Sequence, residues 1–263
     1  MNFVRINDVL LHYRLAGPAG APALALVNSL GTDARIWDAV IADLSREYRI
    51  LSYDKRGHGL SDSPPGDYSL DDHLDDLEGL LDHVGLERLA LCGVSVGGMI
   101  TQGFALRTPG RLTALVLCNT APLMGNYAMW NDRIDIVRKE GLLPLADPVM
   151  ERWFSPDFRA GNSVELAGWR NLFLRTDPAG YAATCATLRD TDLTGAIATI
   201  ALPTLVVAGD ADLAAPVEMV RNCTAIPGSR FEILPGTGHI PSIEQPEKLA
   251  ALMRQFLKEA DHG

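Results

Sequence analysis

The sequence has no apolar run approaching the ~20 residues that a helix needs to cross a membrane. Its N-terminus, from Met1 to Arg5, lacks the basic and apolar regions of a secretory signal peptide. The four cysteines are scattered and form no C-x-x-C pair, which argues against a zinc site and against a disulfide framework. Together these absences favour a protein of the reducing cytoplasm.

Positive charge is also scarce, because 23 Lys and Arg residues stand against 33 Asp and Glu residues, for a net charge of −10. This balance disfavours nucleic acids and anionic membrane surfaces as partners. No cluster of His, Cys and carboxylate residues has the spacing of metal ligands, so we expect neither a metal nor a cofactor. An anionic substrate would need a local cation to offset the general field.

What the chain does have is enough apolar sequence for one large core, since 47% of its 263 residues are hydrophobic. Short apolar runs alternate with helical patterns along most of its length. The expected strands are Phe3–Ile6, Leu10–Leu15, Ala23–Val27, Arg49–Tyr53, the apolar run before Gly93, Thr113–Cys118, Pro203–Gly209 and Arg230–Leu234. This alternation predicts an α/β protein whose mostly parallel sheet is flanked by helices.

The pattern changes between Pro122 and about Thr194, where apolar residues recur at helical spacing and no strand-like run appears. Three of the four tryptophans, Trp130, Trp153 and Trp169, fall here. We therefore predict a helical cap, residues 122–194, inserted after the sixth strand and laid over the sheet. The core is then formed by residues 1–121 and 195–263.

One helix of the core is expected to begin at Ser69, a suitable N-cap residue, and to end at Gly85. Aspartates crowd its first turns, and His73 lies among them. We interpret His73 as part of a solvated helix face and not as a metal ligand.

The motif around which the chain is organised is Gly93-Val94-Ser95-Val96-Gly97. It follows an apolar run and precedes helix-forming residues, which is the strand–turn–helix setting of a G-x-S-x-G nucleophile elbow. The two glycines remove side chains that would collide with the backbone in so tight a turn. Ser95 is therefore the predicted nucleophile, with its hydroxyl exposed above the sheet.

A serine nucleophile needs an adjacent base, and the base needs a group that orients it. His239 follows the last predicted strand and is the best base candidate among the six histidines. His58 is its rival, but we expect His58 to brace the turn after its own strand. Asp210 and Asp212 both follow an earlier strand end, and the two compete for the role of the acid.

Several stretches resemble the α/β-hydrolases and, within them, the 3-oxoadipate enol-lactonases of aromatic catabolism. The matching stretches are Asn28–Asp33 with Trp37, Tyr53–Gly59, Arg152-Trp153-Phe154, Gly180-Tyr181-Ala182 and Ile243–Glu247. The valines beside Ser95, and Pro241-Ser242 after His239-Ile240, depart from the family's usual residues. The resemblance implies the α/β-hydrolase fold and a cofactor-free enzyme that opens 3-oxoadipate enol-lactone to 3-oxoadipate in the β-ketoadipate pathway.

The resemblance also assigns further site residues. The family usually carries its acid in the third place after a glycine that matches Gly209, with a proline four residues beyond, and this favours Asp212 with Pro216. It implies that the backbone N–H groups of Val96 and Leu30 donate to the oxyanion. In the loop that contains Leu30 the family commonly has His-Gly-x, whereas this chain has Asn28-Ser29-Leu30-Gly31.

An enol-lactone of this pathway carries a carboxylate, so the cap should supply a cation. Trp130 and Arg133, three residues apart on an expected helix, share one face. Arg133 is our candidate for a bidentate clamp, with Trp130 as an apolar wall. The alternative is a solvated surface arginine paired with Asp132 or Asp135. Other cap arginines that could serve are Arg138, Arg152, Arg170 and Arg175.

Other functions of the same scaffold stay open at this point, because a fold does not determine a substrate. A carboxylesterase or another lactone hydrolase is the main alternative. A C–C bond hydrolase would use the same three groups, and a ligand-binding protein would keep the fold without turnover.

Overall fold

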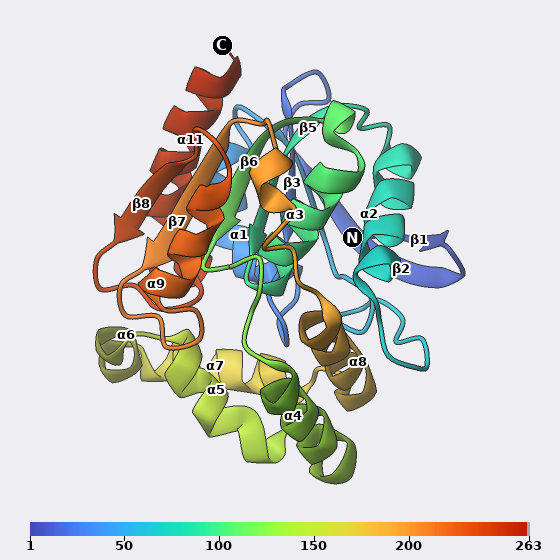
Figure 1. Ribbon diagram of the computed structural model, residues 1–263, viewed down its shortest axis with the longest axis vertical. Helices are drawn as coiled ribbons and strands as arrows, with labels where there is room; N and C mark the ends of the chain where they lie inside the picture. Colours follow the sequence, from blue (N-terminus) through green and yellow to red (C-terminus); the bar gives the residue numbers. More distant parts are fainter. Residues whose placement is uncertain (262–263) are drawn as a thin grey trace.

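The computed structural model describes residues 1–261, so the last two residues of the predicted segment 195–263 lie outside it. One sheet holds eight strands in the order β1-β2-β4-β3-β5-β6-β7-β8 (Figure 1). They are β1 (Asn2–Ile6), β2 (Val9–Ala16), β3 (Ala23–Val27), β4 (Arg49–Tyr53), β5 (Leu89–Val94), β6 (Leu112–Cys118), β7 (Thr204–Gly209) and β8 (Arg230–Leu234). Strands β3 to β8 are parallel, whereas β2 pairs antiparallel with β4 and with β1.

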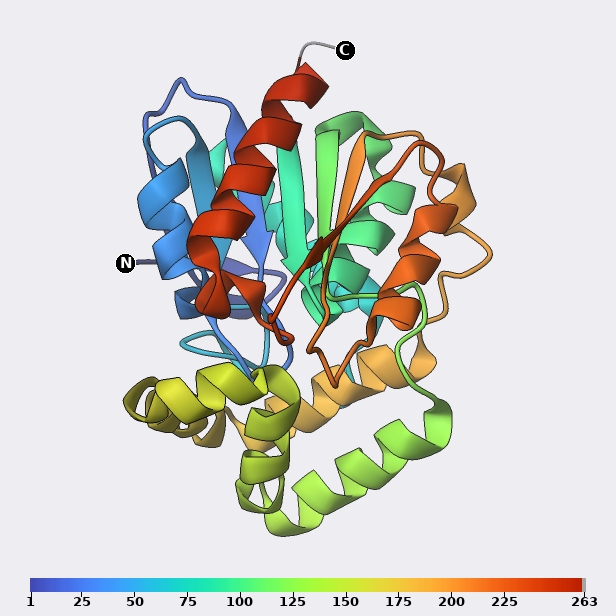
Figure 2. The same ribbon diagram turned by 90° about the vertical axis from the view of Figure 1, so that its left-hand side faces the viewer.

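Helices cover both faces of this sheet (Figure 2). Helices α1 and α11 pack together on one face, and α2 packs on α3 on the other. The core helices are α1 (Asp38–Leu44), α2 (Leu70–Val84), α3 (Val96–Arg107), α9 (Val217–Val220), α10 (Pro241–Glu244) and α11 (Pro246–Asp261). Short 3-10 turns are η1 (Ala34–Trp37), η2 (Pro109–Arg111), η4 (Ile197–Thr199) and η5 (Arg221–Ala225). Because both faces are covered, β5 and β7 are buried along their whole length.

Helix α2 begins and ends as its sequence predicts, but the interpretation of His73 is wrong. Ser69 and Asp72 form a reciprocal capping box at its start, and Gly85 ends it at a φ of 69°. His73 is only 1% exposed, and its ring meets the edge of Tyr68 at a centroid distance of 5.9 Å. The aspartates beside it point to solvent or to arginines, while the histidine faces inward. Local charge therefore did not indicate which side of the helix His73 occupies.

Between Cys118 and Thr204 the described chain forms helices and no strand. These helices are α4 (Tyr127–Glu140), η3 (Leu143–Leu145), α5 (Ala146–Trp153), α6 (Pro156–Gly161), α7 (Ser163–Leu174) and α8 (Pro178–Asp190). They lie together over the carboxyl ends of the parallel strands (Figures 1 and 2). Gly180 of α8 meets Gly57 so closely that a Cβ on Gly180 would lie 2.4 Å from the Gly57 Cα. Only glycines allow the cap and the core to touch backbone to backbone here.

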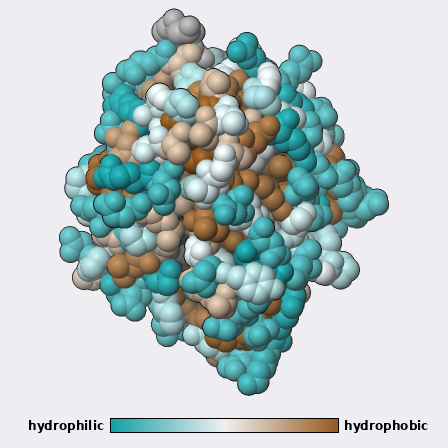
Figure 3. Space-filling model, viewed as in Figure 1, coloured by the Kyte–Doolittle hydropathy of each residue, from teal (hydrophilic) through white to brown (hydrophobic). Residues whose placement is uncertain are grey.

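In the view of Figure 3, hydrophilic residues cover most of the outline, and hydrophobic residues show mainly toward the middle, with smaller patches at the left edge and near the lower end. None of the helices within residues 1–261 is both long enough and apolar enough to span a lipid bilayer.

Candidate active site

Ser95 sits in a strained turn between β5 and α3. Its φ of 58° and ψ of −124° lie in a region that non-glycine residues rarely adopt. A Cβ on Gly93 would lie 2.2 Å from the Gly97 carbonyl oxygen, and one on Gly97 would lie 2.3 Å from that of Val27. Both positions therefore require glycine, and the turn aims Ser95 toward the cap side of the sheet.

His239 and Asp212 come together at the same edge of the sheet. The Asp212 Oδ2 atom accepts a hydrogen bond from His239 Nδ1 over 2.8 Å, and both side chains are buried. The other oxygen, Oδ1, accepts from the backbone N–H groups of Ala214 and Ala215 at 2.6 and 3.0 Å. Because a carboxylate can only accept, His239 carries a proton on Nδ1 and presents Nε2 as a base.

Asp210, the competing acid, is placed differently. It is exposed, and its Oδ1 accepts from the N–H of Gly236 at 2.6 Å. It makes no hydrogen bond with a histidine among the described residues. The structure thus pairs His239 with Asp212 and leaves Asp210 as a loop residue.

Asn119 belongs to this cluster, although the sequence analysis did not identify it. It follows β6 with a φ of 48°, a conformation that asparagine tolerates better than most residues. Its Nδ2 donates to Asp212 Oδ2 at 2.7 Å and to the Gly238 carbonyl at 3.1 Å. An asparagine directly after a parallel strand that ends at the site edge was the available signal.

Hydrogen bonds to residues of the loop after β4 position the loop after β3. Lys55 Nζ donates to the Ser29 carbonyl at 2.6 Å, and His58 Nε2 accepts from the Gly31 N–H at 2.9 Å. Between these two anchors, the N–H of Leu30 donates to no backbone carbonyl of the described chain. Burial holds the pKa of Lys55 and of His58 well below the ordinary values, and the Lys55 charge lowers that of His58 further.

The second expected oxyanion donor is Val96, the first residue of α3. Its N–H precedes any carbonyl that the helix could offer, so it is one of the free donors at the positive helix end. Leu30 and Ser95 line the same cavity, and Val96 follows Ser95 directly in the chain.

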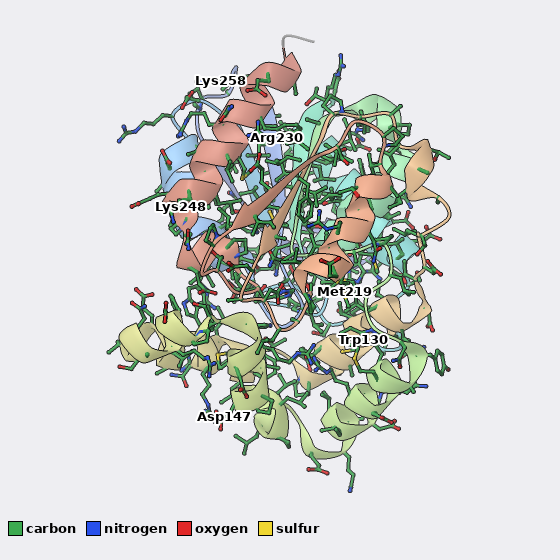
Figure 4. All side chains as sticks on the ribbon, turned by 60° about the vertical axis from the view of Figure 1, so that its left-hand side comes forward. Trp130, Asp147, Met219, Arg230, Lys248 and Lys258 are labelled. Atoms are coloured by element: carbon green, nitrogen blue, oxygen red, sulfur yellow. The ribbon has the colours of Figure 1, made fainter. Side chains whose placement is uncertain are left out.

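That cavity, of about 90 Å³, lies between the core and the cap. Ser95 and His239 line it from the core, and Trp130 and Arg133 line it from α4. Figure 4 shows Trp130 on the cap close to Met219 on α9, and both residues border the same space. The structure therefore gathers the serine, the histidine and both predicted cap residues around one cavity.

Arg133 is half-buried in this cavity and does not form the surface ion pair considered for it. Its guanidinium lies 5.3 Å from the centre of the Trp130 ring and donates to the Tyr181 hydroxyl at 3.3 Å. No carboxylate among the described side chains, which run from residue 1 to 260, pairs with it. An uncompensated guanidinium beside the serine is suited to an anionic ligand.

The other cap arginines separate into two groups. Arg138 pairs with Asp67, Arg170 pairs with Asp147, and Arg175 is exposed away from the cavity. Arg152 alone among them lines the cavity with Arg133.

Glu244 joins the cap to the loop that carries His239. Its carboxylate accepts from the Gly238 N–H at 2.9 Å and from the Ser155 hydroxyl at 2.6 Å. The N–H of His239 donates to the Trp153 carbonyl at 2.7 Å. The end of α5 and the His239 loop are therefore held as one unit.

The side chains that the structure describes, those of residues 1–260, include no group of three or more His, Cys, Asp and Glu that could hold a metal ion. The chemistry that the cavity offers comes instead from a serine hydroxyl, an imidazole oriented by a carboxylate, and backbone donors.

A model described as the alpha/beta hydrolase family matches residues 24–252 of the chain. This chain is an alpha/beta hydrolase. A protein of Acinetobacter baylyi named 3-oxoadipate enol-lactonase 2 is 35% identical to it over 258 residues, which is 95% of each chain. The fold predicted from the sequence is confirmed.

Solved structures of this hydrolase family show the same architecture. The enol-lactonase of Burkholderia xenovorans superimposes with a TM-score of 0.95 at 37% identity, over 98% of this chain and all of that chain. A thermophilic esterase of Thermogutta terrifontis, solved with malate bound, has a TM-score of 0.92 at 28% identity over 98% of each chain. The predicted resemblance to enol-lactonases is thereby confirmed.

Proposed function

We propose that this alpha/beta hydrolase is a cytoplasmic 3-oxoadipate enol-lactonase of aromatic-compound catabolism, which opens the lactone ring to give 3-oxoadipate. The observation that carries the proposal is the cavity, which combines Ser95 and His239 with the guanidinium of Arg133. That guanidinium has no carboxylate partner among the side chains of residues 1–260. The lactone offers both groups that such a cavity would bind, an activated ester and a carboxylate.

The reaction proceeds by covalent catalysis at Ser95. His239, oriented by Asp212, takes the serine proton while the hydroxyl oxygen attacks the ring carbonyl carbon. The N–H groups of Leu30 and Val96 donate to the oxyanion that develops. The ring oxygen leaves as an enolate. His239 transfers its proton to the enolate carbon, which gives a ketone. Water, activated by His239, then releases the acid from Ser95.

Two relatives support an anionic ligand for this cavity. The Acinetobacter baylyi protein is named 3-oxoadipate enol-lactonase 2, and an enol-lactone of this pathway carries a carboxylate. The 28% identical esterase was solved with malate, a dicarboxylate. The main alternative, a carboxylesterase, would use the same serine, histidine and aspartate on an uncharged ester.

The decisive experiment follows the loss of ultraviolet absorbance as purified enol-lactone is hydrolysed, beside a series of neutral aryl esters. The proposal requires kcat/KM for the lactone to exceed that for every aryl ester. A preference for the aryl esters would identify a carboxylesterase. Absence of turnover on all substrates would instead favour a ligand-binding role.

A further inference from the structure

Arg152 is the second cation of the cavity, and nothing in the proposed reaction yet uses it. It lies in the last turn of α5, is half-buried, and lines the cavity with Ser95 and His239. Among the side chains that the structure describes, residues 1–260, it forms no ion pair or hydrogen bond. The cap arginine Arg170 is also half-buried but, by contrast, has Asp147 at 2.6 Å. A half-buried guanidinium without a partner indicates an anion that is supplied from outside the chain.

The position of Arg152 is set by the loop that carries His239. The next residue, Trp153, accepts the His239 N–H at 2.7 Å, so the Arg152 backbone is anchored beside the histidine. Burial, followed by the nearby charge of Arg133, lowers the pKa of Arg152, and Asp212 offsets part of this shift. Arg133 is held elsewhere, by the ring of Trp130 and the Tyr181 hydroxyl. Both guanidinium groups therefore line one cavity, Arg152 from the side of Asp212 and Arg133 from helix α4.

Two cations without carboxylate partners in one small cavity repel each other, and each bound negative charge offsets part of that repulsion. A lactone substrate that carries one carboxylate satisfies only one of them. Hydrolysis creates the second charge. Water adds to the acyl carbon, the bond from that carbon to the Ser95 oxygen breaks, and the serine oxygen takes a proton through His239. The acid that is formed then loses its own proton to solvent.

We propose that the cavity is a dicarboxylate site, in which Arg133 binds the carboxylate that the substrate brings and Arg152 binds the carboxylate that forms at Ser95. The assignment of the second carboxylate to the product rests on the proposed lactone hydrolysis. The binding of a dicarboxylate by two arginines does not, because it follows from the two unpaired guanidinium groups alone.

The test measures competitive inhibition of neutral aryl-ester hydrolysis by adipate and by hexanoate, which match in chain length and differ by one carboxylate. Wild type should bind adipate about tenfold more tightly, the value of one charge-assisted pair. Arg152→Met should abolish that preference and leave hexanoate inhibition unchanged. Arg133→Met should weaken both inhibitors, and Arg170→Met, a control on the cap surface, should weaken neither.

Equal inhibition by adipate and hexanoate in wild type would overturn the inference, and so would an unchanged preference in Arg152→Met. If Arg152→Met fails to fold, Arg152→Lys keeps the charge and should retain part of the preference, and a full loss there would count against the inference. Because the assay uses a neutral ester, a failure to hydrolyse the enol-lactone would refute the proposed function while leaving the adipate preference measurable.

Discussion

The backbone N–H of Gly31 donates to Nε2 of His58, while Nδ1 of the same ring lies 3.2 Å from the Arg56 carbonyl. Since the carbonyl can only accept, the proton resides on Nδ1, and Nε2 keeps its lone pair for Gly31. The depressed pKa of His58, caused first by burial, keeps this neutral form in place. His58 thus positions the loop that carries the Leu30 N–H.

His58→Leu should lower kcat on an aryl ester by about tenfold, less than the full loss of an oxyanion donor, because the loop is displaced and not removed. KM should change little, since Leu30 contacts the ligand mainly in the transition state. His58→Gln, whose side-chain oxygen can replace Nε2 as acceptor, should recover most of the rate. A His58→Leu enzyme with wild-type kcat would show that the loop does not need this anchor.

Ser95→Ala and His239→Ala should each reduce turnover to nearly the same residual level, because the members of such a unit act together. Asp212→Asn should cost far more activity than Asp210→Asn, since only Asp212 contacts His239. Steady-state kinetics on one ester would compare all four variants. Substantial activity in either alanine variant, or the reverse order of the two asparagine variants, would refute the assignment.

Arg133→Met should raise KM strongly for the carboxylated lactone and hardly at all for a neutral aryl ester. The reason is that the substitution removes the charge beside Trp130 while keeping an apolar side chain of similar length. Arg138→Met, on the same helix but paired with Asp67 outside the cavity, is the matched control. Equal effects on both substrates would mean that Arg133 supports the cap without contacting the carboxylate.

Much of this architecture could be predicted because its signals are local. The strands Ala23–Val27 and Arg49–Tyr53 have their predicted bounds. Ala23–Val27 is continuously apolar, as expected for a strand buried on both faces. The nucleophile elbow around Ser95 was equally recognisable, because its two glycines are required by close backbone contacts. Gly93 meets the Gly97 carbonyl, and Gly97 meets the carbonyl of Val27 on the neighbouring strand β3.

The contacts that join distant segments could not be predicted in the same way. Asn119 meets Asp212 across 93 residues, and Glu244 meets Ser155 across 89. Each depends on how two loops are brought together by the sheet, and no periodicity in the sequence records that. The prediction that His73 is solvated was wrong for a related reason. Its neighbours in sequence are charged, whereas its neighbours in space are buried.

His73 leads to a prediction about acid stability. Burial, with a contribution from Lys55 and Arg56, lowers its pKa from 6.5 to about 3. As pH falls, His73 therefore becomes protonated at a higher pH in the unfolded chain than in the folded chain. The free energy of unfolding decreases as pH falls below the ordinary histidine pKa of 6.5. When the pH is lowered from about 7 to about 5, the Tm of His73→Leu should therefore fall less than the Tm of wild type. Circular-dichroism melting curves that shift in parallel for both proteins would contradict this.

The bonds from Glu244 to Ser155 and Gly238, with that from His239 to Trp153, bear on how far the cap is a separable module. A chimera that exchanged α4–α8 for the equivalent helices of another hydrolase would also replace the carbonyl that holds the His239 backbone. It would remove the hydroxyl that Glu244 requires as well. Transplanting substrate preference through the cap therefore means transplanting part of the support of the histidine, so specificity and rate would be inherited together.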